Sequence, residues 1–202
     1  MKLFSTLYFL IVLIIFFISI KLHANNSEHK TSFIPKKLHF QYAGNLGFLS
    51  FGPSWSFLKN SIDLEYSIGY VPKFQSTKPI YVSSIKGIYN PTFLLNIKKI
   101  TFIPLNFGGV VSHVYGERVN KYQNKKQYEK NPYWWIPSLR WGVLSQTSLN
   151  YTIENSTLKT INFYFETSVW DLNIYNYFSN SNHKTLSPTQ LITFAIGSKF
   201  IF

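Results

Sequence analysis

The stretch Ile62-Asp63-Leu64-Glu65-Tyr66-Ser67-Ile68-Gly69-Tyr70 alternates large apolar residues with charged, polar or small ones. Successive side chains of a β-strand point to opposite faces, so an extended chain would separate the two kinds completely. The apolar side chains would share one face, and Asp63, Glu65, Ser67 and Gly69 would share the other. A helix would mix them, so this stretch predicts a strand with two unlike faces.

The same alternation recurs along most of the chain after residue 31. Apolar and polar residues alternate over 161–166 and, with two interruptions, over 192–202. Turn-forming residues separate such segments, as at 59–61 and 154–157. Together these patterns predict eight strands, at about 36–44, 48–58, 62–73, 79–91, 101–115, 134–151, 158–178 and 189–202.

Alternation alone fits two all-β architectures, a soluble sandwich and a membrane barrel. A sandwich buries its apolar face, whereas a membrane barrel turns apolar and aromatic side chains outward and polar ones inward. Aromatic residues make up 19% of this chain, and Tyr133-Trp134-Trp135 lies at a segment end, where interfacial aromatic girdles belong. Several predicted strands also reach the nine to eleven residues or so that cross a bilayer at a tilt. These features favour an eight-stranded antiparallel transmembrane β-barrel.

Charged residues inside the predicted strands support the same architecture. The lumen of a small barrel is filled by side chains, so inward charges should pair with one another. We expect a charge network in which acids and bases pair, formed by Asp63, Glu65, Glu166, Lys86, Arg140 and Lys199. The closing strand ends in Phe202, which resembles the C-terminal signature of bacterial outer-membrane barrels and implies recognition by the barrel assembly machinery.

The N-terminus has the pattern of an export signal. A basic residue precedes the apolar stretch Leu3 to Ile20, and Ala24 offers a small residue for cleavage. We expect a signal peptide over 1–24, a polar periplasmic leader over 25–35 and the barrel over 36–202. An uncleaved anchor helix is the alternative, because about 18 apolar residues can just span a bilayer.

Composition and charge narrow the possible partners. The chain has no cysteine, which excludes disulfides, cysteine-ligated metals and a thiol nucleophile. Its formal net charge is +12, and signal cleavage would remove Lys2 and Lys21 to leave +10. The export signal and the aromatic alternation argue against nucleic acid as the partner of this charge. Phosphate-bearing outer-membrane lipids are the expected partners instead.

The longest connections fall on one side of the predicted barrel. With both ends of the chain in the periplasm, the outer connections are about 45–47, 74–78, 116–133 and 179–188, and the inner ones are 59–61, 92–100 and 152–157. Long outer loops and short periplasmic turns are the rule for such barrels. The loop after strand five is basic, and its candidate contacts to lipopolysaccharide phosphates are Arg118, Lys121, Lys125 and Lys126. A solvated loop in a lysine-rich protein is the alternative.

No sequence motif predicts a cofactor or a metal. The chain lacks the nucleophile-elbow, zinc-protease and glycine-rich phosphate-loop patterns. His29, His39, His113 and His183 do not have the spacing of metal ligands. We therefore expect neither a metal site nor a cofactor.

The layout resembles the lipid A 3-O-deacylase family, eight-stranded outer-membrane barrels that hydrolyse an ester-linked acyl chain. The resemblance lies in the stretches 46–55 and 64–70 and in the closing strand. It implies a histidine and a serine spaced by two in a late strand, with an acid beyond them. The matching positions here read Glu166-Thr167-Ser168, or in a second register Tyr177-Phe178-Ser179-Asn180, and neither holds the histidine.

The candidate catalytic residues are therefore His113, Ser168 and Glu166. His113 would have to reach Ser168 across the barrel, because its neighbour Ser112 points to the opposite face. We expect an integral outer-membrane barrel of a Gram-negative bacterium that is not an enzyme and that contacts lipopolysaccharide or an external partner. The alternative is an ester hydrolase related to the deacylases, with an atypical or decayed active site.

Overall fold

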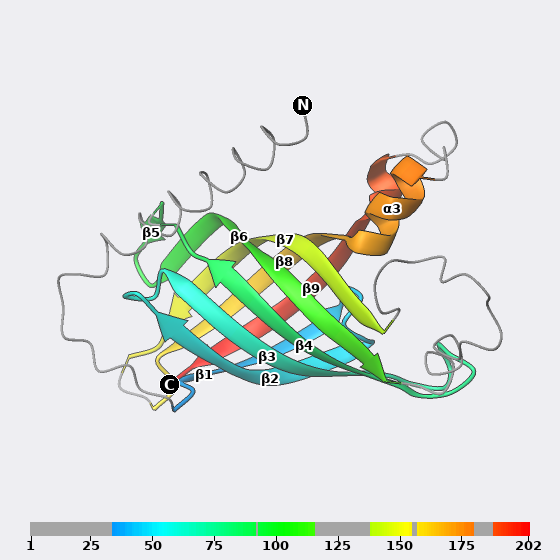
Figure 1. Ribbon diagram of the computed structural model, residues 1–202. Coiled ribbons are helices and arrows are strands. Elements are labelled where there is room, and N and C mark those ends of the chain that lie inside the picture. Colours follow the sequence, from blue (N-terminus) through cyan, green and yellow to red (C-terminus); the bar gives the residue numbers. More distant parts are fainter. Residues whose placement is uncertain (1–33, 92, 116–137, 155–156, 180–187) are drawn as a thin grey trace. The chain divides into compact units, whose positions relative to one another are not determined.

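The computed structural model describes residues 34–91, 93–115, 138–154, 157–179 and 188–202. Within these residues, eight antiparallel strands close into a barrel, and a short strand and two helices lie outside the ring (Figure 1). The elements are β1 (Lys37–Ala43), β2 (Leu49–Phe57), β3 (Ile62–Val71), β4 (Ile80–Tyr89), β5 (Leu95–Ile97), β6 (Ile100–Tyr115), β7 (Leu139–Thr152), β8 (Thr160–Trp170), α3 (Asp171–Ser179), the 3-10 helix η2 (Pro188–Leu191) and β9 (Ile192–Ile201).

Strand pairing runs around the ring almost entirely between neighbours in sequence. The order is β4-β3-β2-β1-β9-β8-β7-β6, and a further pairing of β4 with β6 closes the barrel. The strand β5 pairs only with β6, as a small hairpin at one rim. The predicted all-β, eight-stranded antiparallel barrel is confirmed, whereas the hairpin strand β5 was not predicted.

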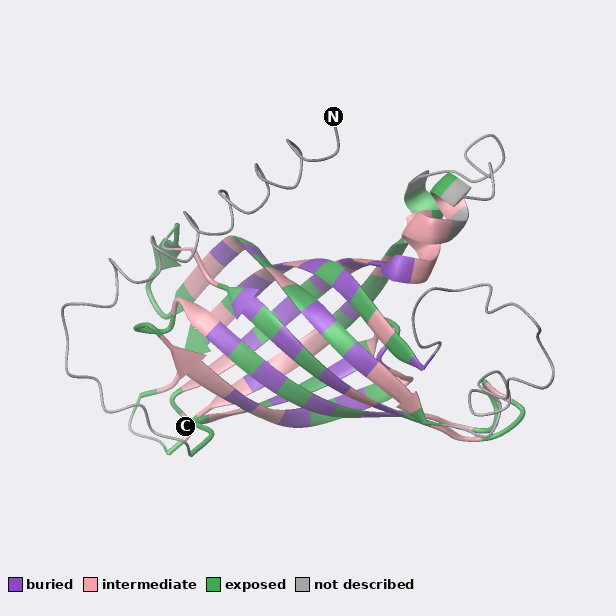
Figure 2. Ribbon diagram, in the orientation of Figure 1, coloured by how far each residue is buried: buried purple, intermediate pink, exposed green. Residues whose placement is uncertain are grey.

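The two faces of the strands differ as the alternation predicts. In β3, the side chains of Asp63, Glu65 and Ser67 are buried, while Leu64 and Ile68 are exposed on the outside. Buried and exposed residues alternate in the same way along most strands (Figure 2). The barrel is therefore inverted relative to a soluble domain, with polar groups inside and large apolar groups outside.

The ends of the barrel differ in the connections that they carry. The end at which β9 finishes, here called the Phe202 end, carries the connections 58–61, 90–99 and 153–159. The opposite end, here called the α3 end, carries the connections 44–48, 72–79, 116–138 and 171–191 (Figure 1). The predicted assignment of each connection to one of the two ends is confirmed, and the two longest connections, 116–138 and 171–191, share the α3 end.

One predicted strand was too long at its C-terminal side. We expected a strand over 158–178, but β8 ends at Trp170 and α3 begins at Asp171. The pairing of β8 with β9 ends at Val169 and Ile192, the first residue of β9, so beyond Trp170 one of the two neighbouring strands is no longer there to form backbone hydrogen bonds. A helix satisfies these groups internally, and an aspartate in its first turn favours its start.

A bulge in β6 changes which residues point inward. The register of β6 against β7 shifts between Ile103 and Asn106, around Pro104, which has no N–H to donate to a strand ladder. The Thr147 hydroxyl of β7 donates to the Pro104 carbonyl at 2.8 Å. Before the bulge Ile103 points inward, and after it the even-numbered residues do, beginning with Asn106.

Gly197 of β9 makes room for an aromatic ring inside the barrel. A Cβ atom at this position would overlap the Tyr164 hydroxyl oxygen and would lie 2.5 Å from the Phe40 carbonyl oxygen. The Tyr164 ring, from the directly paired position on β8, thus covers the bare backbone of Gly197.

The predicted signal peptide, 1–24, and most of the predicted leader lie outside the described residues. The predicted strand start at 134–137 lies outside them too. Within the described part of the chain, neither helix has the length and apolarity needed to cross a membrane.

Candidate functional site: the lumen of the barrel

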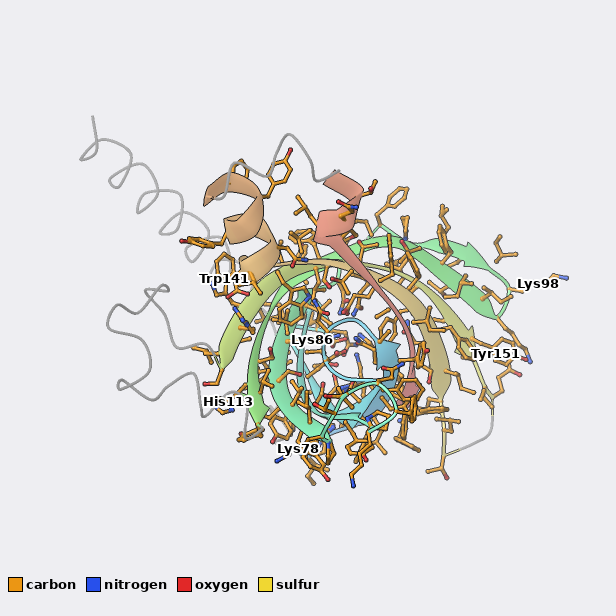
Figure 3. The ribbon with its side chains drawn as sticks, turned by 90° about the vertical axis from the view of Figure 1, so that its right-hand side faces the viewer. Lys78, Lys86, Lys98, His113, Trp141 and Tyr151 are labelled. Atoms are coloured by element: carbon orange, nitrogen blue, oxygen red, sulfur yellow. The ribbon has the colours of Figure 1, made fainter. Side chains whose placement is uncertain are left out.

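The lumen is filled with charged and hydrogen-bonding side chains. Figure 3, viewed along the barrel, shows Lys86 inside the ring of strands and His113, Trp141 and Tyr151 outside it. Three acids and three lysines face inward, together with one histidine. They are Asp63, Glu65, Glu166, Lys37, Lys86, Lys199 and His39.

The centre of the lumen is an ion pair between β4 and β8. Lys86 Nζ lies 2.6 Å from Glu166 Oε2, and both side chains are at most 2% exposed. Gln146 Nε2 also donates to Glu166 Oε2, at 2.7 Å. Lys86 Nζ donates to Gln41 Oε1, which also accepts the Tyr164 hydroxyl at 3.1 Å. Every charge at this level thus has an opposite charge and at least one amide partner.

A second ion pair lies next to the first. Lys199 Nζ is 2.7 Å from Glu65 Oε1 and donates to Gln146 Oε1 at 3.4 Å, which links the two pairs into one network. The same ammonium lies 5.1 Å from the centroid of the Tyr164 ring. Because the network joins β1, β3, β4, β7, β8 and β9, it crosslinks the wall of the barrel through its interior.

The Phe202 end of the lumen opens into a polar cavity. Lys37 Nζ lies 2.9 Å from Asp63 Oδ1, which also accepts the Ser56 hydroxyl at 2.7 Å. Beyond this pair a cavity of about 480 Å³ extends to the rim. Its amide-bearing lining residues are Asn60, Asn90, Asn106, Asn150 and Asn162. Such a lining suits ordered water.

The α3 end is closed by apolar side chains instead. Leu46, from the β1–β2 connection, belongs to one buried cluster with Trp170 at the end of β8 and with inward residues of β4, β6 and β7, which are Ile88, Val110 and Leu144. Trp170 Nε1 donates to the Ser168 hydroxyl at 3.0 Å. Buried apolar side chains thus lie toward the α3 end of the lumen, and ion pairs fill its middle.

The structure does not bring the candidate catalytic residues together. Glu166 and Ser168 both point into the lumen, but Glu166 is bound by Lys86 and Ser168 by Trp170. His113 lies on the outside of β6, with its ring 4.4 Å from that of Tyr115. The barrel wall therefore separates His113 from Ser168.

The predicted ion pairs are partly right. Lys86 pairs with Glu166 and Lys199 with Glu65. Arg140 does not join this network, because it lies at the α3 end, where its Nη1 is 3.6 Å from Asp171 Oδ2 at the start of α3. Asp63 pairs with Lys37, a residue that the sequence reasoning left out.

One histidine–serine contact was missed. His39 Nε2 and the Ser67 hydroxyl are 2.8 Å apart, from strands that are not neighbours in the barrel. The alternation over 62–70 places Ser67 on the polar face, but only closure of the barrel brings it to His39. A base and a hydroxyl at this distance can form a nucleophile pair. Both residues are 1% exposed, however, and neither lines the cavity at the Phe202 end.

Other predicted contacts lie outside the described residues. These are the candidate phosphate contacts Arg118, Lys121, Lys125 and Lys126, which fall within 116–137. The described part of the chain contains no cluster of three or more histidine, aspartate or glutamate side chains that suits a metal ion.

Comparison of this chain with protein-family models, with curated proteins and with solved structures gave no match.

Proposed function

We propose that this chain is an integral outer-membrane β-barrel of a Gram-negative bacterium, exported by a cleaved signal peptide. The observation that carries the proposal is the inverted distribution of side chains. Phe51, Phe163 and Ile196 are each more than half exposed on the outside, while Lys86 and Glu65 are fully buried inside. Apolar surface of this extent marks a membrane or partner interface in a folded protein.

Aromatic residues on the outside support the same placement. At the α3 end, Tyr70, Tyr81 and Tyr115 stand side by side on β3, β4 and β6 and are each about half exposed. At the Phe202 end, Tyr89 and Tyr151 occupy comparable outward positions. Tyrosine favours membrane interfaces because its ring is apolar and its hydroxyl is polar.

The distance between these aromatic rows fits the hydrocarbon layer. On β4, Tyr81 and Tyr89 are eight residues apart. At ~3.4 Å per residue this is ~27 Å along the strand, which a tilt of ~40° shortens to ~21 Å. The apolar band of outer-membrane barrels is ~25 Å tall.

The membrane proposal is tested by fractionation and electrophoresis. The chain should sediment with outer membranes, require detergent for extraction and migrate faster unheated than boiled on a denaturing gel. N-terminal sequencing of the mature protein should begin at Asn25. Recovery of the folded chain from the soluble periplasm without detergent would refute the proposal.

We further propose that the role of the barrel is not catalytic and that its outer loops contact lipopolysaccharide or an external partner. The α3 end carries the basic connection after β6, where lysines would meet lipid phosphates. Changing Lys121, Lys125 and Lys126 to serine should reduce photo-crosslinking to lipopolysaccharide in whole cells. Unchanged crosslinking would remove this loop from the proposal.

The hydrolase alternative is tested by the mass spectrum of lipid A from cells with and without the protein. We expect the same acyl chains in both, because the one histidine–serine hydrogen bond found in the described part of the barrel is sealed in the lumen. Loss of one hydroxyacyl chain in the presence of the protein would establish a deacylase.

A further inference from the structure

A groove with a volume of about 590 Å³ runs over the outside of the barrel across β7, β8, β9 and β1. It exists because two small side chains interrupt rows of large ones. Ser198 stands between Phe163 and Phe40 in the strand register, and Thr147 stands next to Phe165. The aromatic side chains form the ridges of the groove, and Ser198 and Thr147 lie between them.

The groove offers an apolar surface to its occupant. Phe163, Phe165 and Ile196 along it are about half exposed. The Thr147 hydroxyl is already bonded to the Pro104 carbonyl. An open, apolar groove of this kind matches an extended hydrocarbon chain.

Two lysines lie at the Phe202 end of the barrel, each directly before a strand that forms the groove. Lys36 precedes β1 and Lys159 precedes β8, and both are exposed. The Phe202 amide donates to the Lys36 carbonyl at 2.9 Å, and the Lys159 amide donates to the Ile201 carbonyl at 2.8 Å, so the lysines flank Phe202 at the Phe202 end. Neither lysine forms an ion pair with a described residue, the α-carboxylate of Phe202 included.

The spacing of the lysines and the groove fits one lipid molecule. Ser198 is four residues from Phe202, which is ~14 Å along the strand and ~10 Å along the membrane normal at a tilt of ~40°. One leaflet contributes ~15 Å of hydrocarbon. A phosphate held at the lysine row would therefore send its acyl chains past Ser198.

We propose that the wall formed by β1, β8 and β9 binds one phospholipid. Its phosphate lies between Lys36 and Lys159, and one acyl chain lies in the groove over Ser198. This inference rests on the proposed membrane location and adds a specific lipid to it. The Phe202 end faces the periplasm in the proposed orientation, so the lipid is a phospholipid of the inner leaflet rather than lipid A.

Native mass spectrometry of the detergent-solubilised barrel, titrated with phosphatidylglycerol, tests the site. Lys36→Gln and Lys159→Gln should each weaken the first lipid-bound state about fivefold, and together about 25-fold. Ser198→Phe should weaken it about tenfold, because at least two methylenes of the chain would lose apolar contact. Diacylglycerol, which has no phosphate, should bind poorly, and the two lysine substitutions should not change its binding.

Matched control variants separate the site from general detergent exchange. Lys98→Gln removes an exposed lysine from the β5–β6 turn at the same end, and Val143→Phe adds a ring to the outside of β7 away from the groove. Both controls should bind lipid as the unchanged chain does. Heat-modifiable migration confirms that each variant is folded, and Ser198→Leu replaces Ser198→Phe if the latter is not.

Equal affinity in all variants would overturn the site, and so would a Ser198→Phe variant that binds normally. Tighter binding of lipid A than of phosphatidylglycerol would overturn the assignment to a phospholipid. None of these outcomes affects the membrane proposal, because the barrel would still need detergent for extraction from membranes. Failure of the membrane proposal gives a different result, a folded chain that is soluble without detergent.

Discussion

Removing Lys86 should destabilise the barrel strongly, because its partner Glu166 cannot reach water. The ammonium and the carboxylate are 2.6 Å apart, and their side chains are 0% and 2% exposed. Breaking a buried pair by removing one partner typically costs about 3–5 kcal/mol, since the other charge is left uncompensated. Gln146 still donates to Glu166 in the Lys86→Met variant, so we expect the lower part of this range, about 3 kcal/mol.

The double variant Lys86→Met/Glu166→Gln removes both charges and should recover most of this loss. The amide that replaces the Glu166 carboxylate would retain hydrogen-bonding atoms for Gln41 and Gln146, and no charge would be buried alone. We expect the double variant to be more stable than Lys86→Met by about 2 kcal/mol. Replacing a buried pair as a whole is often close to neutral for the same reason.

The exposed pair Lys99–Glu154 provides the control. Its atoms are 3.3 Å apart, but the two side chains are 52% and 67% exposed, so Lys99→Met should cost less than about 1 kcal/mol. Reversible urea unfolding in detergent micelles, followed by tryptophan fluorescence and gel migration, measures all three variants. If the Lys86→Met loss is as small as that of Lys99→Met, or if the double variant is no more stable than Lys86→Met, the lumen network does not stabilise the fold as argued.

Three further results are expected from the same assays and from conductance. Gly197→Val should lower the free energy of unfolding by about 1–3 kcal/mol, because its Cβ would overlap the Tyr164 hydroxyl oxygen and the Phe40 carbonyl oxygen; an unchanged unfolding midpoint would contradict this. Trp170→Ala should cost about 3–5 kcal/mol by leaving a cavity beside Leu46 and removing the donor to Ser168, which a variant of normal stability would disprove. The unchanged chain should show no steady conductance in planar bilayers, because the lumen is filled by paired side chains; a stable open channel would show that the network opens.

The outward position of His113 could not be predicted from the sequence, for a physical reason. Parity along a strand holds only while the register is unbroken, and the bulge around Pro104 shifts the inward positions of β6 by one residue. Without the bulge the odd-numbered residues of β6 would continue to point inward from Ile103, and His113 would face the lumen. With it, Ser112 points inward and His113 outward.

The sequence by itself determined the eight strands of the barrel, the two unlike faces of strands with unbroken alternation, and the end of the barrel to which each connection belongs. These features follow from the period-two pattern, as in 62–70, which is local and needs no partner. The same pattern assigns Glu65 to the interior without reference to any tertiary contact. Which inward groups meet was decided only by the tertiary structure. The Lys86–Glu166 pair joins residues 80 apart in sequence, and the His39–Ser67 contact joins residues 28 apart. Both depend on barrel closure and strand register, because the lumen brings together side chains from strands that share no backbone hydrogen bonds.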